Sequence, residues 1–240
     1  MDYLFILAIG LAAGTISGIV GFGSSIMLMP VLVLAFGPLQ AVPIMAIAAL
    51  MANGSRIAAW WREVDWKTCA AYSATGAPFA ALGAATLLTL PTRVIEAALG
   101  LFFIAMIFVR RWMAARQLRM SRAQLALLGV PIGFLTGIVV STGPITAPLF
   151  LAAGLVKGAF LSTEAAASLA VYLAKAAVFR EFGALPLDIV VKGLAVGSTL
   201  TAGSFLAKRF VLKLDPGHFR LLMDALMLAS GAILLGAVAF

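Results

Sequence analysis

The sequence predicts an all-α polytopic membrane protein made of two inverted structural repeats, each a broken helical hairpin followed by three transmembrane helices. The composition, the apolar runs and a pattern shared by the two halves lead to this prediction. Hydrophobic residues make up 63% of the chain and charged residues 11%, whereas soluble proteins average about 45–50% and about 25%. So few charges could not cover a soluble protein of this composition. Unbroken apolar runs also argue against a transmembrane β-barrel, whose strands alternate.

Six apolar runs are long enough to cross a bilayer as single helices, which takes about 20 residues. We expect these helices at 38–60, 67–90, 92–113, 159–180, 185–207 and 216–239. Trp60, Trp61, Trp66 and Trp112 lie at the ends of three of these runs. Tryptophan is enriched at membrane–water interfaces, so these residues need no ligand to explain them.

Two further apolar stretches, 4–36 and 123–156, are too long for one untilted span. Small and helix-breaking residues interrupt each stretch near its middle. These are Gly21-Phe22-Gly23-Ser24-Ser25 in the first stretch and Ser141-Thr142-Gly143-Pro144 in the second. We therefore expect each stretch to form two short helices joined by a break.

The two halves share an order of features around these breaks. Two glycines spaced four residues apart precede each break, and a proline follows it: Gly14, Gly18 and Pro30 in the first half, Gly133, Gly137 and Pro148 in the second. This order predicts a duplicated unit, as in many transporters, with one repeat at 1–115 and the other at 116–240 of a single membrane domain. The four glycines are interpreted as helix-packing residues.

Basic residues predict the orientation. The formal net charge is +8, and five arginines lie between the halves: Arg110, Arg111, Arg116, Arg119 and Arg122. Lys and Arg favour cytoplasmic loops, so we expect the loop 110–122 inside and no nucleic-acid partner. The basic loop 208–213 also lies inside if the second broken stretch is a hairpin. Each half then has an odd number of segments, which inverts the second copy and places residues 37 and 157 on opposite sides.

The two breaks are the leading candidates for a substrate site. Non-helical backbone at membrane depth is tolerated only where protein or a water-filled cavity surrounds it. Helix ends at such breaks present free N–H groups and positive dipole ends, which suit an oxyanion. The alternative is that these small residues only allow close helix packing. The candidate substrate-binding residues at the breaks are Gly21, Phe22, Gly23, Ser24, Ser25, Ser141, Thr142 and Gly143.

Polar residues inside two of the predicted spans add to this candidate site. Lys175 lies deep in an apolar run, where a lysine costs about 2.5–3.5 kcal/mol to insert. Asn53 is its approximate counterpart in the first half, and Arg56 follows one helical turn later on the same face. We expect all three to bind substrate. The alternative for Lys175 and Arg56 is that they extend along apolar surface to the membrane boundary.

Two carboxylates are candidates for proton coupling. Asp224 lies well inside the last span and Glu96 lies nearer the start of its own. Buried carboxylates in membranes commonly carry protons, although Asp224 could instead pair with Arg220, its neighbour one turn back.

The chain has one Cys and one His, too few for a protein metal cage. We therefore expect no enzyme activity, no catalytic residues, no metal and no cofactor.

Three features together resemble the TauE/SafE family of sulfite and organosulfonate exporters over essentially the whole chain. They are the glycine-rich segment at 18–30, the alanine-rich span that carries Asn53 before a Trp-Trp-Arg loop, and the second copy at 133–148. The resemblance implies a multi-pass protein of the bacterial inner membrane that exports small sulfur-containing anions.

The function expected from these observations is secondary transport. We expect export of sulfite or an organosulfonate such as sulfoacetate by alternating access, coupled to protons. The expected partners are the small anionic substrate and the lipid bilayer, and a homodimer is also allowed. One alternative is a membrane assembly or chaperone subunit that transports nothing. Buried charges argue against it, because they are costly to insert into a membrane and a scaffold has no use for them. The other alternative is an anion channel.

Overall fold

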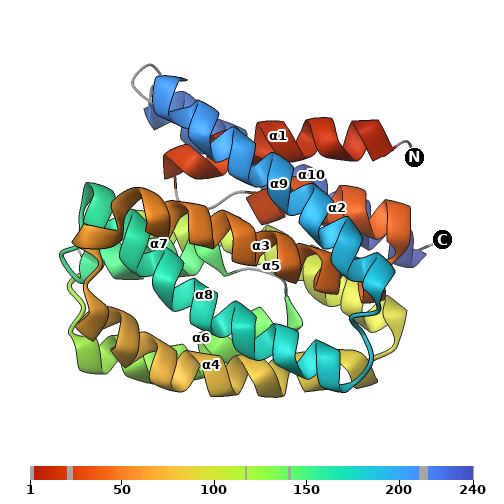
Figure 1. The fold of residues 1–240 in the computed structure, drawn as a ribbon, viewed down its shortest axis with the longest axis horizontal. Helices are drawn as coiled ribbons and strands as arrows, with labels where there is room; N and C mark the ends of the chain where they lie inside the picture. Colours follow the sequence, from red (N-terminus) through yellow and green to blue (C-terminus); the bar gives the residue numbers. More distant parts are fainter. Residues whose placement is uncertain (1–2, 21–23, 117, 140–141, 211–215, 240) are drawn as a thin grey trace.

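The computed structural model describes residues 3–20, 24–116, 118–139, 142–210 and 216–239. These residues form ten α-helices joined by short connections (Figure 1). In the first half they are α1 (Tyr3–Val20), α2 (Ser24–Phe36), α3 (Pro38–Trp60), α4 (Trp66–Thr89) and α5 (Thr92–Ala114), with a short 3-10 turn at Trp61–Glu63. In the second half they are α6 (Arg122–Ile138), α7 (Gly143–Ala152), α8 (Lys157–Glu181), α9 (Leu187–Phe210) and α10 (Pro216–Ala239).

The predicted helices are confirmed along the chain. Each of the six expected single spans coincides with one helix, and each of the two long stretches is divided into two helices. The first division falls between Val20 and Ser24, and the second between Ile138 and Gly143. The described residues thus form an all-α fold, as predicted.

Capping residues fix where several helices begin. The carboxylate of Asp65 precedes α4 and accepts hydrogen bonds from the backbone N–H groups of Lys67 and Thr68. The hydroxyl of Thr68 also donates to Asp65, and this bond holds the pKa of Asp65 below its ordinary value. Ser121 and Gln124 form a capping box at the start of α6. Proline opens α3 and α7, where its missing N–H would have no helical partner.

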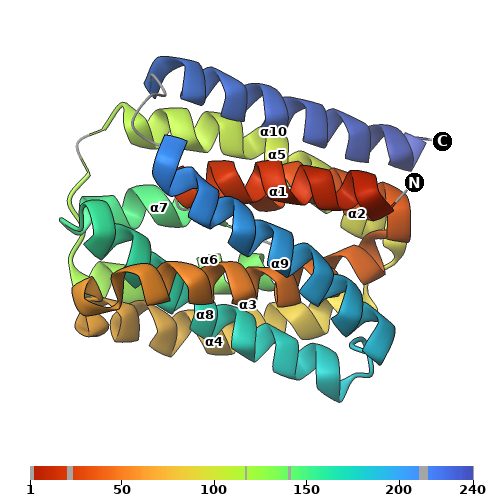
Figure 2. The ribbon, with the colours of Figure 1, turned by 45° about the horizontal axis from the view of Figure 1, so that its top comes forward.

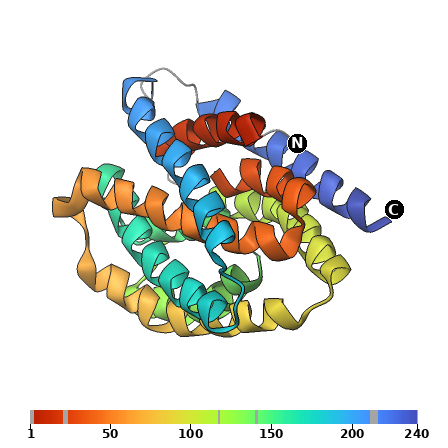
Figure 3. The ribbon, with the colours of Figure 1, turned by 45° about the vertical axis from the view of Figure 1, so that its right-hand side comes forward.

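The helices pack in pairs that correspond between the two halves. If α1–α5 are matched in order to α6–α10, the contact of α1 with α9 corresponds to that of α6 with α4, and the contact of α3 with α9 to that of α8 with α4. Two further large contacts each join a helix to its own counterpart, α3 to α8 and α5 to α10. Figure 2 shows α10 running alongside α5, and Figure 3 shows α9 crossing over α3.

The two hairpins point in opposite directions. In Figure 1 the α1–α2 hairpin has its open end at the right, where the N-terminus lies and α3 begins. The α6–α7 hairpin has its open end at the left, where α8 begins. The two hairpins therefore enter the helix bundle from opposite ends.

The outer surface is apolar and the interior is partly polar, as a protein surrounded by lipid requires. Leu127, Phe108 and Phe182 are more than 60% exposed, whereas Glu164 and Lys175 are at most 4% exposed. Among the described residues, three helical segments are long and apolar enough to cross a membrane: Pro38–Glu63, Thr92–Met113 and Leu187–Leu206. The long helix α8 is not among these three segments, and two of its charged residues, Glu164 and Lys175, are buried in the interior.

Glycines bring two of the helix pairs into backbone contact. A Cβ added at Gly133 would lie 2.8 Å from the Cα of Gly76, across the contact between α6 and α4. A Cβ added at Gly14 would lie 2.6 Å from the Cα of Leu200, across the contact between α1 and α9. The structure thus supports the interpretation of these glycines as packing residues.

Replacing Gly137 by alanine is expected to destabilise the protein. The new Cβ would lie 2.6 Å from the backbone N of Ala84, so α4 and α6 would have to separate, at a cost of about 1–3 kcal/mol as for other overpacked sites. Thermal unfolding in detergent measures the loss. The control is Gly236→Ala, where the added Cβ has no atom within 4 Å and alanine should hold or raise the unfolding temperature. Equal unfolding temperatures for the two variants would contradict the close contact.

Candidate functional site

The candidate site lies along one face of α8 that is turned toward the break between α6 and α7. Residues four, seven and eleven positions apart share a helix face, and Glu164, Ser168, Val171 and Lys175 have this spacing. Glu164 is 4% exposed and Lys175 is fully buried. The two ends of this face therefore carry opposite charges inside the protein.

Lys175 is bound to the helix that ends at the second break. Its ammonium donates a hydrogen bond of 2.9 Å to the backbone carbonyl of Thr136. This carbonyl belongs to the last turn of α6, where carbonyls lack helical partners and a positive charge is favourable. The side chain is fully buried, which excludes extension to the membrane boundary. The Thr136 hydroxyl also lies 2.6 Å from the hydroxyl of Thr142, which links the two sides of the break.

Arg56 reaches from α3 into the same region. Its guanidinium forms an ion pair with Glu164 at a distance of 3.1 Å between Nη1 and Oε2. It also donates a hydrogen bond to the side-chain oxygen of Asn53, one turn earlier in α3. The Arg56 side chain is 11% exposed, so it points inward and does not extend to the boundary.

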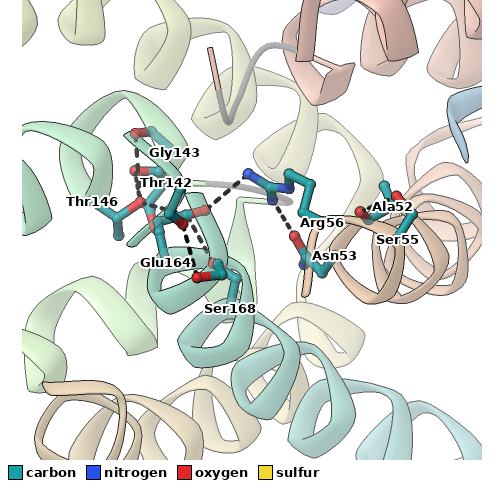
Figure 4. A network of polar contacts seen from close by, with 11 residues as sticks. Ala52, Asn53, Ser55, Arg56, Thr142, Gly143, Thr146, Glu164 and Ser168 are labelled. Carbon is teal, nitrogen blue, oxygen red and sulfur yellow. Dashed lines mark hydrogen bonds and ion pairs between the residues drawn. The ribbon is translucent and has the colours of Figure 1, made fainter. Parts of the chain in front are cut away.

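The Glu164 carboxylate accepts hydrogen bonds from side chains of three helices (Figure 4). Besides Arg56 from α3, it accepts hydrogen bonds from the hydroxyl of Thr146 in α7, at 3.3 Å, and from that of Ser168 in its own helix, at 2.9 Å. The Thr146 hydroxyl also lies 3.3 Å from the backbone carbonyl of Thr142 and 3.5 Å from that of Gly143, at the start of α7, so its one proton is shared among these acceptors and Glu164. The carboxylate is thus tied to the second break.

A small polar cavity lies between the Lys175 contact and the Glu164 contact. Its volume is about 10 Å³, which holds about one water molecule. The cavity is lined by Tyr72, Thr136, Thr142, Gly143, Thr146, Ser168, Val171 and Tyr172. A larger groove of about 680 Å³ runs between α1, α9 and the end of α2. That groove is lined mostly by apolar side chains and lies away from the buried charges, so we place the site at the small cavity.

The structure brings five of the predicted site residues together around the second break, two of them from the first half of the chain. Asn53, Arg56, Thr142, Gly143 and Lys175 all lie at or beside the second break. Among the candidates at the first break, Ser24 and Ser25 are buried at the start of α2. Gly21, Phe22, Gly23 and Ser141 lie outside the described residues. Ile26 of α2 and Val139 after α6 belong to one hydrophobic cluster, so the described flanks of both breaks face a common core.

Asp224 has partners other than the one considered from its own helix. Its carboxylate pairs with the guanidinium of Arg110 and, at 2.8 Å, with that of Arg111. Both arginines come from α5, and the pairs join α5 to α10 near the end of α5. Glu96 lies half-buried near the start of α5. Neither carboxylate belongs to the cavity between Glu164 and Lys175.

Sequence reasoning missed several residues of the site: Tyr72, Thr136, Thr146, Glu164 and Ser168. Two signals were present in the sequence. Glu164 and Ser168 stand on the face of α8 that carries Lys175, at helical spacing. Thr136 and Thr146 flank the second break by a turn of helix on either side, where their hydroxyls can serve the unpaired ends.

Comparison with known proteins identifies a family. A protein-family model described as "Sulfite exporter TauE/SafE" matches residues 6–234. Searches of curated proteins and of solved structures found no match to the chain.

Proposed function

Because the chain belongs to the TauE/SafE family of sulfite exporters, we propose that it exports a small sulfur-containing oxyanion across the bacterial inner membrane. Sulfite and organosulfonates such as sulfoacetate are the proposed substrates. The family consists of membrane transporters, and the apolar helices mark this chain as a multi-pass membrane protein. The identity of the substrate, the identity of the membrane and the transport mechanism are parts of this proposal.

The observation that carries the substrate proposal is the buried ammonium of Lys175 at the second break. A lysine has three N–H donors, and within the described residues one of them binds the carbonyl of Thr136. The others can bind an anion. A charge in a dry interior is costly unless an opposite charge or hydrogen bonds accompany it, so a small anion beside Lys175 would be stabilised strongly. The hydroxyls of Thr142 and Thr146 supply further donors around the cavity.

We propose alternating access between two inverted repeats as the mechanism. The corresponding helix contacts in the two halves support this proposal, as do the hairpins that enter from opposite ends in Figure 1. In a protein with inverted repeats, the two halves can exchange conformations that are related by a two-fold axis in the membrane plane. This exchange opens a central site to each side of the membrane in turn. The cavity holds about one water molecule, so helices must move apart to admit an anion.

Proton coupling is also proposed, with Asp224 and Glu96 as the candidates. The ion pairs of Asp224 with Arg110 and Arg111 support a packing role for this carboxylate. Glu96 is therefore the first carboxylate to replace, as Glu96→Gln, when proton-driven transport is measured.

A purified sample is expected to be stabilised by sulfite, sulfoacetate, sulfolactate or taurine, and less by acetate and other carboxylates of similar size. A ligand at 100 times its Kd adds about 2.7 kcal/mol to the free energy of unfolding. A thermal-shift series over these anions measures the effect, and counterflow in proteoliposomes then distinguishes a carrier from a channel. Absence of any anion effect would contradict the transporter and favour an assembly subunit.

A further inference from the structure

The Arg56–Glu164 ion pair joins the two halves of the protein at the candidate site. Arg56 belongs to α3 in the first half and Glu164 to α8 in the second. The two side chains are 11% and 5% exposed, with 3.1 Å between Nη1 and Oε2. Buried ion pairs commonly add little net stability, because desolvation offsets their attraction. A pair of this kind at a proposed transport site therefore calls for a functional explanation.

The donors around Glu164 are of the kind that bind oxyanions. A guanidinium and two hydroxyls surround the carboxylate, from Arg56, Thr146 and Ser168. Guanidinium groups bind carboxylate, phosphate and similar oxyanions through the same N–H geometry. The carboxylate of Glu164 thus accepts the same kind of hydrogen bonds from these donors that a sulfonate or sulfite oxygen would accept.

Two of these donors also line the place proposed for the substrate. Thr146 and Ser168 line the small cavity together with Thr136, whose backbone carbonyl accepts from Lys175. An anion that enlarged this cavity and approached Lys175 would come within reach of the hydroxyls that now bind Glu164. The anion and the carboxylate would repel each other, and both would be attracted to Arg56.

We propose that Glu164 is a tethered competitor of the exported anion. In the empty protein its carboxylate occupies the donors of Arg56, Thr146 and Ser168, and the arriving anion displaces it from Arg56. The proposal rests on the proposed function and assigns Glu164 a positioning role in it. In the empty protein the ion pair neutralises the charge of Arg56 inside the membrane. The protein can then change back to its starting conformation without substrate and without an unpaired buried charge.

Replacing Glu164 by glutamine is the test. The amide keeps the shape and can still accept from Arg56, but its neutral oxygen competes more weakly than a carboxylate. We expect the Kd for the best sulfur oxyanion to fall about tenfold, which corresponds to about 1.4 kcal/mol. Counterflow should persist, because it needs only the loaded protein, whereas net efflux should slow, because the empty protein returns with an unneutralised Arg56.

Two further variants keep the test decisive. Glu164→Asp retains the charge but holds it about one methylene farther from Arg56, so its Kd should fall between those of wild type and Glu164→Gln. If the glutamine variant does not fold, the aspartate variant carries the test alone. The matched control is Asp188→Asn, which removes a carboxylate from the surface pair with Lys192, where the Asp188 side chain is 60% exposed. This control should leave affinity and net efflux unchanged.

The outcomes separate this inference from the proposed function. If wild type binds none of the sulfur oxyanions, the proposed function fails. If wild type binds one of them and both Glu164 variants bind it with unchanged or weaker affinity, the function stands and the competitor role is overturned. A loss of thermal stability with unchanged affinity would show that Glu164 only braces α3 against α8.

Discussion

Replacing Lys175 by glutamine is expected to weaken binding of the sulfur oxyanion by about 10- to 150-fold, while the protein still inserts and folds. The fold-change corresponds to the loss of a charge-assisted hydrogen bond worth about 1.5–3 kcal/mol. The glutamine amide can still donate to the carbonyl of Thr136, which now accepts from Lys175. The end of α6 therefore keeps a partner while the positive charge is lost, and the effect on binding is separated from the effect on folding.

The measurement is anion affinity from thermal-shift titration, with size-exclusion chromatography to show that the variant is folded. Lys192→Gln is the control, because Lys192 pairs with Asp188 on α9, away from the cavity. Lys175→Ala should weaken binding further and also lower stability, since it leaves the Thr136 carbonyl without its donor. Wild-type affinity in a folded Lys175→Gln sample would exclude Lys175 from the site.

Replacing Arg56 by alanine is expected to destabilise the protein by about 3–5 kcal/mol, because it leaves the buried carboxylate of Glu164 without its cation. The Glu164 side chain is 5% exposed, so bulk water solvates its carboxylate poorly when the guanidinium is removed. Asn53 would also lose the donor that now binds its side-chain oxygen. Thermal or detergent-induced unfolding measures the loss.

A double variant distinguishes stability from transport. Arg56→Gln with Glu164→Gln removes both charges, and it should recover most of the stability that Arg56→Ala loses, because no buried charge remains unpaired. Transport should stay low in the double variant, since Arg56 is one of the cations proposed to bind the anion. Additive losses of stability would show that the two side chains are not coupled, and full transport activity would exclude Arg56 from the mechanism.

The helix boundaries could be predicted because the signals are local. The helix expected at 38–60 is α3 (Pro38–Trp60), since a proline opens it and a charged loop follows it. Lys175 could be singled out in the same way, because a charge within an apolar run has a high insertion cost. Its partner could not be predicted. The carbonyl of Thr136 is available only because α6 ends at the break and α8 packs beside it.

The ion pairs were missed because they depend on contacts between distant segments. Glu164 stands near the start of α8 after Ser162 and Thr163, where polar residues are typical of a helix end near water. Its burial follows from the packing of α8 against α3, α4 and α7. Asp224 shows the same limit. The sequence places Arg220 one turn before Asp224 in α10, whereas in the structure Asp224 pairs with two arginines of α5.

The packing of α1 against α9 has a consequence for synthesis at the ribosome. α1 is made well before α9, and the backbones of the two helices touch at Gly14 and Leu200. While α2 to α8 are being made, α1 therefore has only lipid or temporary neighbours along its glycine face. Its contact with α9 forms only after α9 has left the ribosome. Assembly of this part of the fold is for this reason a late event, in which a helix made later holds an earlier one in place.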